Sequence, residues 1–127
     1  MIKMQKDLSQ ARSKDLGLSD FCNWVFELNT CVRDIQHTIT YLKQFMADEL
    51  VETPLLVGPG SSYIIKEPLG VVAILGSWNY PFVTTISPMA TAIAAGNVVI
   101  LKPSEMCPHS SKMIKTLIAM SLDVNCY

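Results

Sequence analysis

Apolar residues recur at alternating spacings of four and three along residues 21–46, which is the pattern of one face of a long helix. The set comprises Phe21, Val25, Leu28, Val32, Ile35, Ile39, Leu42 and Met46. Ser19 lies just ahead of it and is of a residue type that caps helix N-termini. A coiled coil would show a similar seam, but the lack of an ordered charge pattern beside it favours ordinary packing. We therefore expect residues 1–52 to form an N-terminal helical segment.

A different pattern follows in residues 53–69, which we interpret as a linker and β-segment. The stretch ETPLLVGPGSS contains two prolines and two glycines, and these residues favour a change of direction. The run SYIIK that follows it has the composition of a short strand. The segment therefore predicts a connection between two layers of structure.

Two apolar runs rich in β-branched residues, VVAIL (71–75) and NVVILKP (97–103), predict buried strands of a parallel sheet. Pro81 and Pro88 bracket the start of a helix between them, and Gly96 provides its stop. Pro108 opens a last helix, with Ile114, Leu117 and Ile118 on one face. This order predicts an α/β fold, an incomplete Rossmann-like parallel βαβα unit over residues 70–127. Two such strands cannot cover themselves, so the domain looks truncated at Tyr127.

The composition excludes several classes of protein. Hydrophobic residues make up 50% of the chain and charged residues 17%, with a net charge of -1, which indicates a globular protein without a basic surface for nucleic acid. The four cysteines, Cys22, Cys31, Cys107 and Cys126, form no CxxC pair and have no histidine cluster nearby, so no metal site is expected. The N-terminus lacks the apolar core of a signal peptide. We expect a reduced, cytoplasmic protein.

Candidate chemistry lies where the two strands end, because open α/β sheets bind ligands beyond the carboxyl ends of their strands. Glu105 follows the second strand, 29 residues after Gly76, at roughly the interval of a ribose-binding carboxylate. Lys102 can donate to the same ribose or reach a phosphate. The pair is also compatible with an ordinary solvated strand end, and the GxGxxG fingerprint is absent.

The run GSWNYPF (76–82) follows the first strand and contains unusual residues for a turn. Asn79 is compatible with two roles. It can cap the following helix, or its amide can donate a hydrogen bond to an oxyanion that forms during a reaction. Trp78 and Tyr80 are likewise compatible with plain core positions or with a place in a site.

Two longer stretches then point to a family. EPLGVVAILGSWNYPF, followed by AIAAGNVVILKPSE, closely resembles the aldehyde dehydrogenase superfamily, and the helix ending in YLKQFMADELVETP is similar to its class 3 branch. The resemblance covers about residues 15–122, whereas MIKMQKDLSQAR does not obviously match the first helices of that class. It implies an N-terminal fragment of the NAD-binding region of an enzyme that oxidises aldehydes to carboxylic acids with NAD or NADP.

The resemblance also implies roles for single residues. Asn79 corresponds to the family's oxyanion-hole asparagine, and Lys102 and Glu105 to residues that hold the adenosine ribose of NAD(P). Trp78 would lie near the cofactor, and Tyr80 would border the substrate channel. The family uses a non-classical nucleotide turn, which accounts for the missing glycine fingerprint, and the full-length enzyme would be a homodimer.

Parts of the family's machinery do not occur in these 127 residues. The nucleophilic cysteine with its preceding Gly-Gln and the general-base glutamate of an ELGG-like stretch are both absent, so we expect the chain alone to be inactive and prone to association. The alternative is a non-catalytic interaction or nucleotide-binding module derived from the family. The sequence leaves open which aldehyde is the substrate, whether a later segment anchors the protein to a membrane, and whether NAD or NADP binds. Glu105 would repel a 2′-phosphate, whereas Lys102 would attract one.

Overall fold

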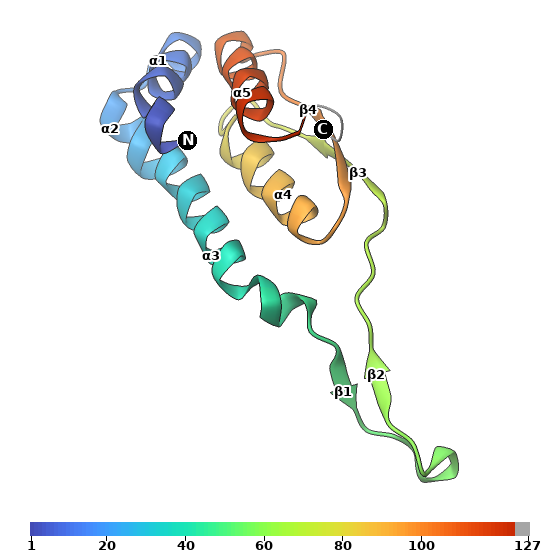
Figure 1. Ribbon diagram of the computed structural model, residues 1–127. Helices are drawn as coiled ribbons and strands as arrows, with labels where there is room; N and C mark the ends of the chain where they lie inside the picture. Colours follow the sequence, from blue (N-terminus) through green and yellow to red (C-terminus); the bar gives the residue numbers. More distant parts are fainter. Residues whose placement is uncertain (124–127) are drawn as a thin grey trace.

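The computed structural model of the chain describes residues 1–123 and consists of a helical body with a long hairpin arm (Figure 1). The elements are η1 (Ile2–Met4), α1 (Gln5–Leu16), α2 (Asp20–Asn23), η2 (Trp24–Leu28), α3 (Asn29–Met46), β1 (Glu49–Val51), η3 (Leu55–Val57), β2 (Ser62–Ile64), β3 (Val71–Leu75), α4 (Val83–Ala94), β4 (Val98–Lys102) and α5 (Pro108–Ser121).

The predicted long helix is present as the continuous run of α2, η2 and α3. The Ser19 side chain caps it by accepting a hydrogen bond from the Cys22 N–H at 3.3 Å, as expected. The η2 stretch is π-helical, and a π-turn adds a residue to the helical repeat. The apolar seam is therefore displaced at its N-terminal end, where Phe21 is 70% exposed and Val25 is exposed as well, and it is only partly covered beyond the π-turn, since Ile39 and Met46 of α3 are 68% and 65% exposed. Further along, α3 packs against α4, so ordinary packing within the chain is confirmed.

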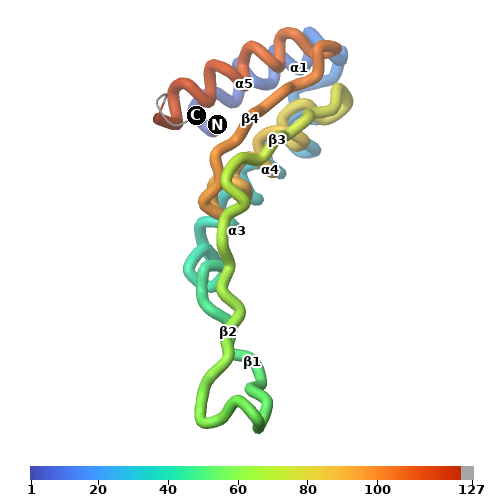
Figure 2. Tube along the Cα trace, turned by 90° about the vertical axis from the view of Figure 1, so that its right-hand side faces the viewer, coloured from blue at the N-terminus to red at the C-terminus, as the bar shows by residue number. Residues whose placement is uncertain are grey.

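Helix α1 lies within the helical segment predicted for residues 1–52, but the sequence did not single it out as a separate helix. It ends at Gly17, whose φ of 68° lies in the left-handed region that favours glycine. Its Leu8 and Ala11 are buried, and the helix packs against α5 at the other end of the chain. This packing brings the first and last α-helices, α1 and α5, side by side (Figures 1 and 2).

The arm consists of β1 and β2, which pair antiparallel and project away from the helices (Figure 2). The strand predicted within SYIIK is confirmed as β2, whereas β1 lies inside the segment that we expected to be helical. Helix α3 ends at Met46 because the chain turns extended at Ala47. The Thr53 side chain fastens the two strands by accepting from the Ser62 N–H at 2.9 Å.

The predicted βαβα unit is confirmed. β3 and β4 pair in parallel, with Val71 opposite Val98 and Leu75 opposite Lys102. Helix α4 ends two residues before Gly96, whose φ is 84°, and Pro108 is the first residue of α5. Pro88 lies inside α4 and does not mark its start.

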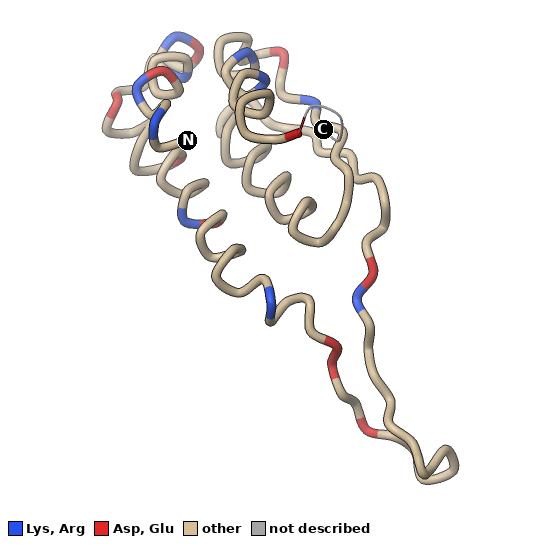
Figure 3. The backbone as a smooth tube through the Cα atoms, in the orientation of Figure 1, with Lys and Arg blue, Asp and Glu red and all other residues tan. Residues whose placement is uncertain are grey.

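The two strands are covered on one face, so the expectation that both are fully buried is wrong for this chain. Ile74 is buried with Phe82 and Ile86 of the adjoining loop and helix, and with Ile114 of α5. On the other face Val71, Leu75 and Ile100 are 63%, 76% and 62% exposed. Acidic and basic residues are interspersed over the helices and loops (Figure 3). Among residues 1–123, no helix is both long and apolar enough to cross a bilayer.

Candidate functional site

Two loops meet at the carboxyl edge of the small sheet, and together with Lys102, the last residue of β4, they carry every site residue predicted from the sequence. Residues 76–82 connect β3 to α4, and residues 103–107 connect β4 to α5. The Gly76 N–H donates to the Lys102 carbonyl at 2.9 Å, which continues the strand pairing into the loops. The parallel register therefore sets the two loops beside each other, as the sequence predicts for a ligand-binding edge.

Asn79 is exposed on the first loop and does not cap α4. Its Oδ1 accepts a hydrogen bond from Ser77 Oγ at 2.7 Å, and no side chain of the loop caps the helix N-terminus. The interpretation of Asn79 as a helix cap is therefore wrong. Its Nδ2 group forms no hydrogen bond with any residue of the described chain, so an amide donor remains available at this edge.

The two aromatic residues beside Asn79 are not core residues. Trp78 is 56% exposed and Tyr80 is 43% exposed, whereas Phe82 of the same loop is fully buried. The Arg12 guanidinium carbon lies 5.6 Å from the centre of the Tyr80 ring, within the range of a cation–π contact. Phe82 thus anchors the loop in the core, while Trp78 and Tyr80 present their rings to the surface.

Lys102 and Glu105 form an exposed ion pair at the end of β4. Lys102 Nζ lies 2.5 Å from Glu105 Oε2. The hydrogen bond from Lys102 lowers the pKa of Glu105 below its ordinary value, with the positive charge of Lys102 adding to the effect. A carboxylate that stays ionised at neutral pH can accept hydrogen bonds from sugar hydroxyls, and the neighbouring ammonium group can donate to them or to a phosphate.

Sequence reasoning missed a buried polar cluster beneath the first loop, which consists of Arg12, Asn23 and Glu27. Arg12 Nε and Glu27 Oε2 form an ion pair, and Arg12 Nη1 donates to Asn23 Oδ1 at 2.9 Å. Burial raises the pKa of Glu27 above its ordinary value, although Arg12 and two backbone N–H groups act in the opposite direction. One signal was available: Asn23 and Glu27 lie four residues apart and share a face of the predicted helix.

Glu27 caps α4, because its Oε1 accepts hydrogen bonds from the Phe82 and Val83 N–H groups. The carboxylate of Asp15 has a similar role at α5. It accepts hydrogen bonds from the backbone N–H groups of His109 at 3.1 Å and of Ser110 at 2.7 Å, and so caps α5. A carboxylate at this end of a helix is favourable because the helix dipole is positive there. The N-terminal helices thus supply caps to both helices that follow the site loops.

The buried cysteines of the described chain are poor nucleophiles. Burial raises the pKa of Cys31 to about 12, and it also raises the pKa of Cys107. Because the thiolate is the reactive form, both groups stay protonated and unreactive at neutral pH. Cys126 lies outside the described residues.

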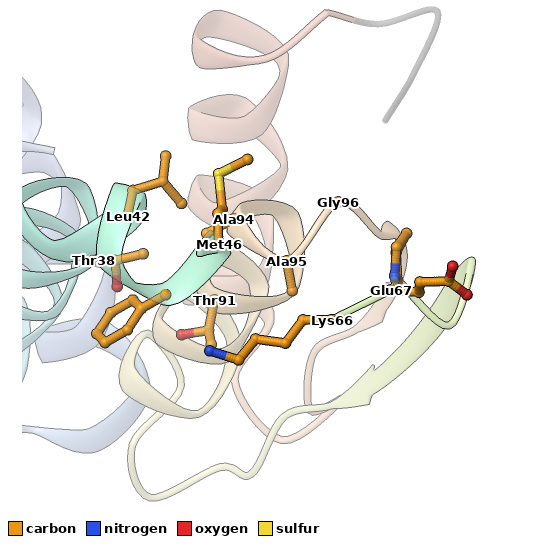
Figure 4. Close-up of a pocket in the computed structure, with 11 residues that line it drawn as sticks. Thr38, Leu42, Met46, Lys66, Glu67, Thr91, Ala94, Ala95 and Gly96 are labelled. Carbon is orange, nitrogen blue, oxygen red and sulfur yellow. The ribbon is translucent and has the colours of Figure 1, made fainter. Parts of the chain in front are cut away.

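A cleft of about 450 Å³ lies at the other end of α4, remote in the fold from the site loops (Figure 4). Leu42 and Met46 of α3 and Ala94 and Ala95 of α4 contribute to its lining, together with Lys66 from the base of the arm. None of the site residues predicted from the sequence contributes to this cleft.

Comparisons with known proteins agree with the motifs. The sequence model of the aldehyde dehydrogenase family matches residues 1–123, which includes the N-terminal residues that the motifs left unmatched. The chain is 41% identical over 123 residues to the dimeric NADP-preferring aldehyde dehydrogenase of Canis lupus familiaris, covering 97% of this chain and 27% of that protein. It is 40% identical over 119 residues to aldehyde dehydrogenase family 3 member H1 of Arabidopsis thaliana, covering 94% and 25%.

The fold is likewise similar to a solved structure, the substrate-bound state of AldH from Staphylococcus aureus. The TM-score is 0.94 at 37% sequence identity, covering 98% of this chain and 27% of that one. The chain thus spans about a quarter of the length of the relatives that it matches.

Proposed function

The chain belongs to the aldehyde dehydrogenase family, and from this premise we propose that it supplies the oxyanion donor and part of the cofactor site of an NAD(P)-dependent aldehyde dehydrogenase. The observation that carries the proposal is the Nδ2 group of Asn79, which has no hydrogen-bond partner in the described chain and is exposed at the carboxyl edge of the sheet beside Lys102 and Glu105. A helix cap would have used this side chain. Its availability supports a role toward a bound molecule instead.

In the proposed reaction an aldehyde, water and NAD(P)⁺ become a carboxylic acid, NAD(P)H and a proton. Attack of a thiolate on the carbonyl carbon turns the carbonyl oxygen into an oxyanion. The Asn79 amide donates a hydrogen bond to this oxygen, which carries more charge in the transition state than in the aldehyde, so the bond accelerates the reaction. The thiolate and the base that activates water come from residues outside these 127.

Lys102 and Glu105 would hold the adenosine ribose of the cofactor, which accepts a hydride when it is bound. The ion pair fits this task because it is exposed and offers both an acceptor and a donor to the two hydroxyls of a ribose. The name of the dog relative, dimeric and NADP-preferring, supports an NAD(P) cofactor and a homodimer. Trp78 would lie near the cofactor, and Tyr80 would border the substrate channel.

Substitutions at Asn79 test the proposal in a chimera in which residues 1–123 replace the matching segment of the dog relative. Asn79→Ala should lower kcat roughly 100- to 1000-fold, the usual cost of one missing oxyanion donor. Asn79→Asp should be worse, because an ionised carboxylate has no proton to donate and repels the developing charge. Steady-state kinetics with an aromatic aldehyde gives kcat for each variant.

Cofactor binding is the internal control for these variants. The Kd of NAD and of NADP should stay within about twofold in both, because Lys102 and Glu105 are unchanged. Full turnover in Asn79→Asp would remove Asn79 from the chemistry and contradict the proposal.

We further propose that the 127-residue chain alone is inactive. Cys31 and Cys107 are buried and protonated, and no cysteine of the sequence has the context of the family's nucleophile. Incubating the purified chain with an aromatic aldehyde and either cofactor should produce no reduced cofactor above background. Turnover that disappears when one of the chain's own cysteines is replaced would contradict this expectation.

A further inference from the structure

The buried ion pair of Arg12 and Glu27 lies directly beneath the loop that carries Asn79. Arg12 and Glu27 are 2% and 0% exposed, and Asn23 beside them is fully buried. Burying two charges is costly, and an apolar pair of similar size often serves stability as well or better. The contacts that this pair makes with other parts of the chain therefore indicate what it contributes.

Those contacts converge on the site loop, which is the stretch 76–82 between β3 and α4, and on the start of α4. Glu27 Oε1 accepts hydrogen bonds from the Phe82 N–H at 2.6 Å and from the Val83 N–H at 3.2 Å. Arg12 Nη2 donates to the Asn79 carbonyl at 3.3 Å. Both ends of the stretch 79–83 are thus held by charged groups from the N-terminal helices.

The loop needs this support because it provides no side-chain cap of its own. Phe82 occupies the N-cap position of α4, and no side chain of the loop accepts a hydrogen bond from the first N–H groups of the helix. The Asn79 side chain is held by Ser77 instead. Glu27 takes over the capping, so the Asn79 Nδ2 group is not needed to hold the helix.

The π-turn of η2 contributes to this arrangement. Glu27 lies within the stretch Trp24–Leu28, where the helical repeat is widened. In this stretch Glu27 is buried, as is Asn23 just before it, whereas the apolar Phe26 faces solvent at 58% exposure. π-turns occur often at functional sites, and here one aims a carboxylate at the start of another helix.

We propose that Arg12 and Glu27 are positioning residues that hold the Asn79 amide in the orientation its oxyanion role requires. This inference rests on the proposed function. Glu27 fixes the start of α4, and Arg12 fixes the Asn79 backbone through its carbonyl and covers the Tyr80 ring. Asn79 itself reaches the substrate, and the pair acts through it.

The double variant Arg12→Met/Glu27→Leu separates positioning from plain stability in the 127-residue chain. Methionine and leucine fill the space and leave no unpaired charge, so the fold should persist. They provide no partner for the Phe82 and Val83 N–H groups or for the Asn79 carbonyl. Hydrogen–deuterium exchange should therefore speed up at least tenfold in peptides spanning residues 77–84, while peptides of α3 and α5 keep their protection.

Asp15→Asn is the matched control, because Asp15 caps α5 in the way that Glu27 caps α4. It should alter exchange at the start of α5 and leave residues 77–84 unchanged. Unchanged exchange at residues 77–84 in the double variant would overturn the proposal. A uniform rise over all helices would also overturn it, because it would show a merely structural role.

Kinetics in the chimera with the dog relative distinguishes failure of this inference from failure of the proposed function. The double variant should lower kcat about 100-fold, the effect of misplacing a catalytic group by about 1 Å, with KM and cofactor Kd within about twofold. Arg12→Gln/Glu27→Gln, which leaves no unpaired charge and keeps an acceptor oxygen for the Phe82 and Val83 N–H groups, should retain most of kcat. If Asn79→Ala loses turnover and the double variant does not, positioning by the pair is refuted and the role of Asn79 stands. If Asn79→Ala keeps turnover, the proposed function fails, and the inference fails with it.

Discussion

Cys31 illustrates at the scale of one residue how burial changes chemistry. The side chain is fully buried between helices, and its pKa rises to about 12, mainly through burial, with the negative charges of Glu27 and Asp34 adding to the effect. The pKa of the folded state thus lies above that of the unfolded chain. The protonated thiol therefore contributes stability that is fully present below pH 9 and is lost as the pH rises toward 12.

We predict a pH-dependent difference between wild type and Cys31→Ala. At pH 7 the variant should lose about 1 kcal/mol of unfolding free energy, because a buried group is removed. The difference should shrink above pH 9, because the unfolded wild-type chain then releases a proton that the folded chain retains. Urea denaturation at pH 7 to 10 measures it. A difference that is constant with pH would show that the thiol titrates normally in the folded chain.

Gly76 begins the site loop at a point of close contact with α4. A Cβ atom at this position would overlap the Cγ2 methyl of Thr85, which is fully buried and donates a hydrogen bond to the Pro81 carbonyl. The methyl group cannot move aside without breaking this bond. The site loop therefore requires glycine for space at this position.

We predict that Gly76→Ala lowers the unfolding free energy by about 1–3 kcal/mol, the usual cost of overpacking. Thr85→Ser should rescue most of the loss, because it removes the methyl and keeps the hydroxyl. Gly17→Ala is the matched control: its cost comes from the positive φ, and Thr85→Ser should not rescue it. Chemical denaturation of the three single variants and of the two double variants that contain Thr85→Ser measures the coupling, and strictly additive losses for Gly76→Ala and Thr85→Ser would contradict the contact.

The sequence predicts the positions of Asn79, Lys102 and Glu105 because each lies shortly after a short apolar run, and such runs define where strands end. The ion pair of Arg12 and Glu27 was beyond sequence reasoning. It depends on how two helices fold back on each other after Gly17, which no local pattern specifies. Whether Asn79 and its neighbours bind substrate and cofactor stays a prediction.

At the scale of elements, regular periodicity allowed prediction of the helices and its interruption caused the errors. The α3 helix and the βαβα unit follow from spacing and from Gly and Pro signals. The π-turn of η2 breaks the 3.6-residue repeat on which the seam from Phe21 to Met46 was built, so Phe21 and Val25 are exposed. The sequence did not single out α1 as a separate helix, because the charged stretch QKDLSQARSKDL shows only a weak apolar face.

At the scale of the whole molecule, the described residues leave apolar surface exposed in several places, and two of these places are the segments that contain the strands. One is the open face of β3 and β4, which includes Val71, Leu75 and Ile100, and the other is the arm, where Leu55 and Leu56 are fully exposed. Within residues 1–123, β3 and β4 pair only with each other, so each has an unpaired edge. Contiguous apolar surface and open edges favour association in water.

We predict that the 127-residue chain self-associates and binds a hydrophobic dye mainly through the sheet face. Val71→Thr/Ile100→Thr should lower both, because threonine keeps the strand preference and removes apolar surface. Val99→Thr, on the covered face, is the matched control; it should destabilise the chain without lowering association.

The double variant Leu55→Ser/Leu56→Ser tests the arm. If this variant alone abolished association, the sheet face would not be the cause. Sedimentation velocity and dye fluorescence measure these effects. A wild-type chain that stays monomeric and binds no hydrophobic dye would contradict the prediction and favour the alternative of a self-contained interaction module.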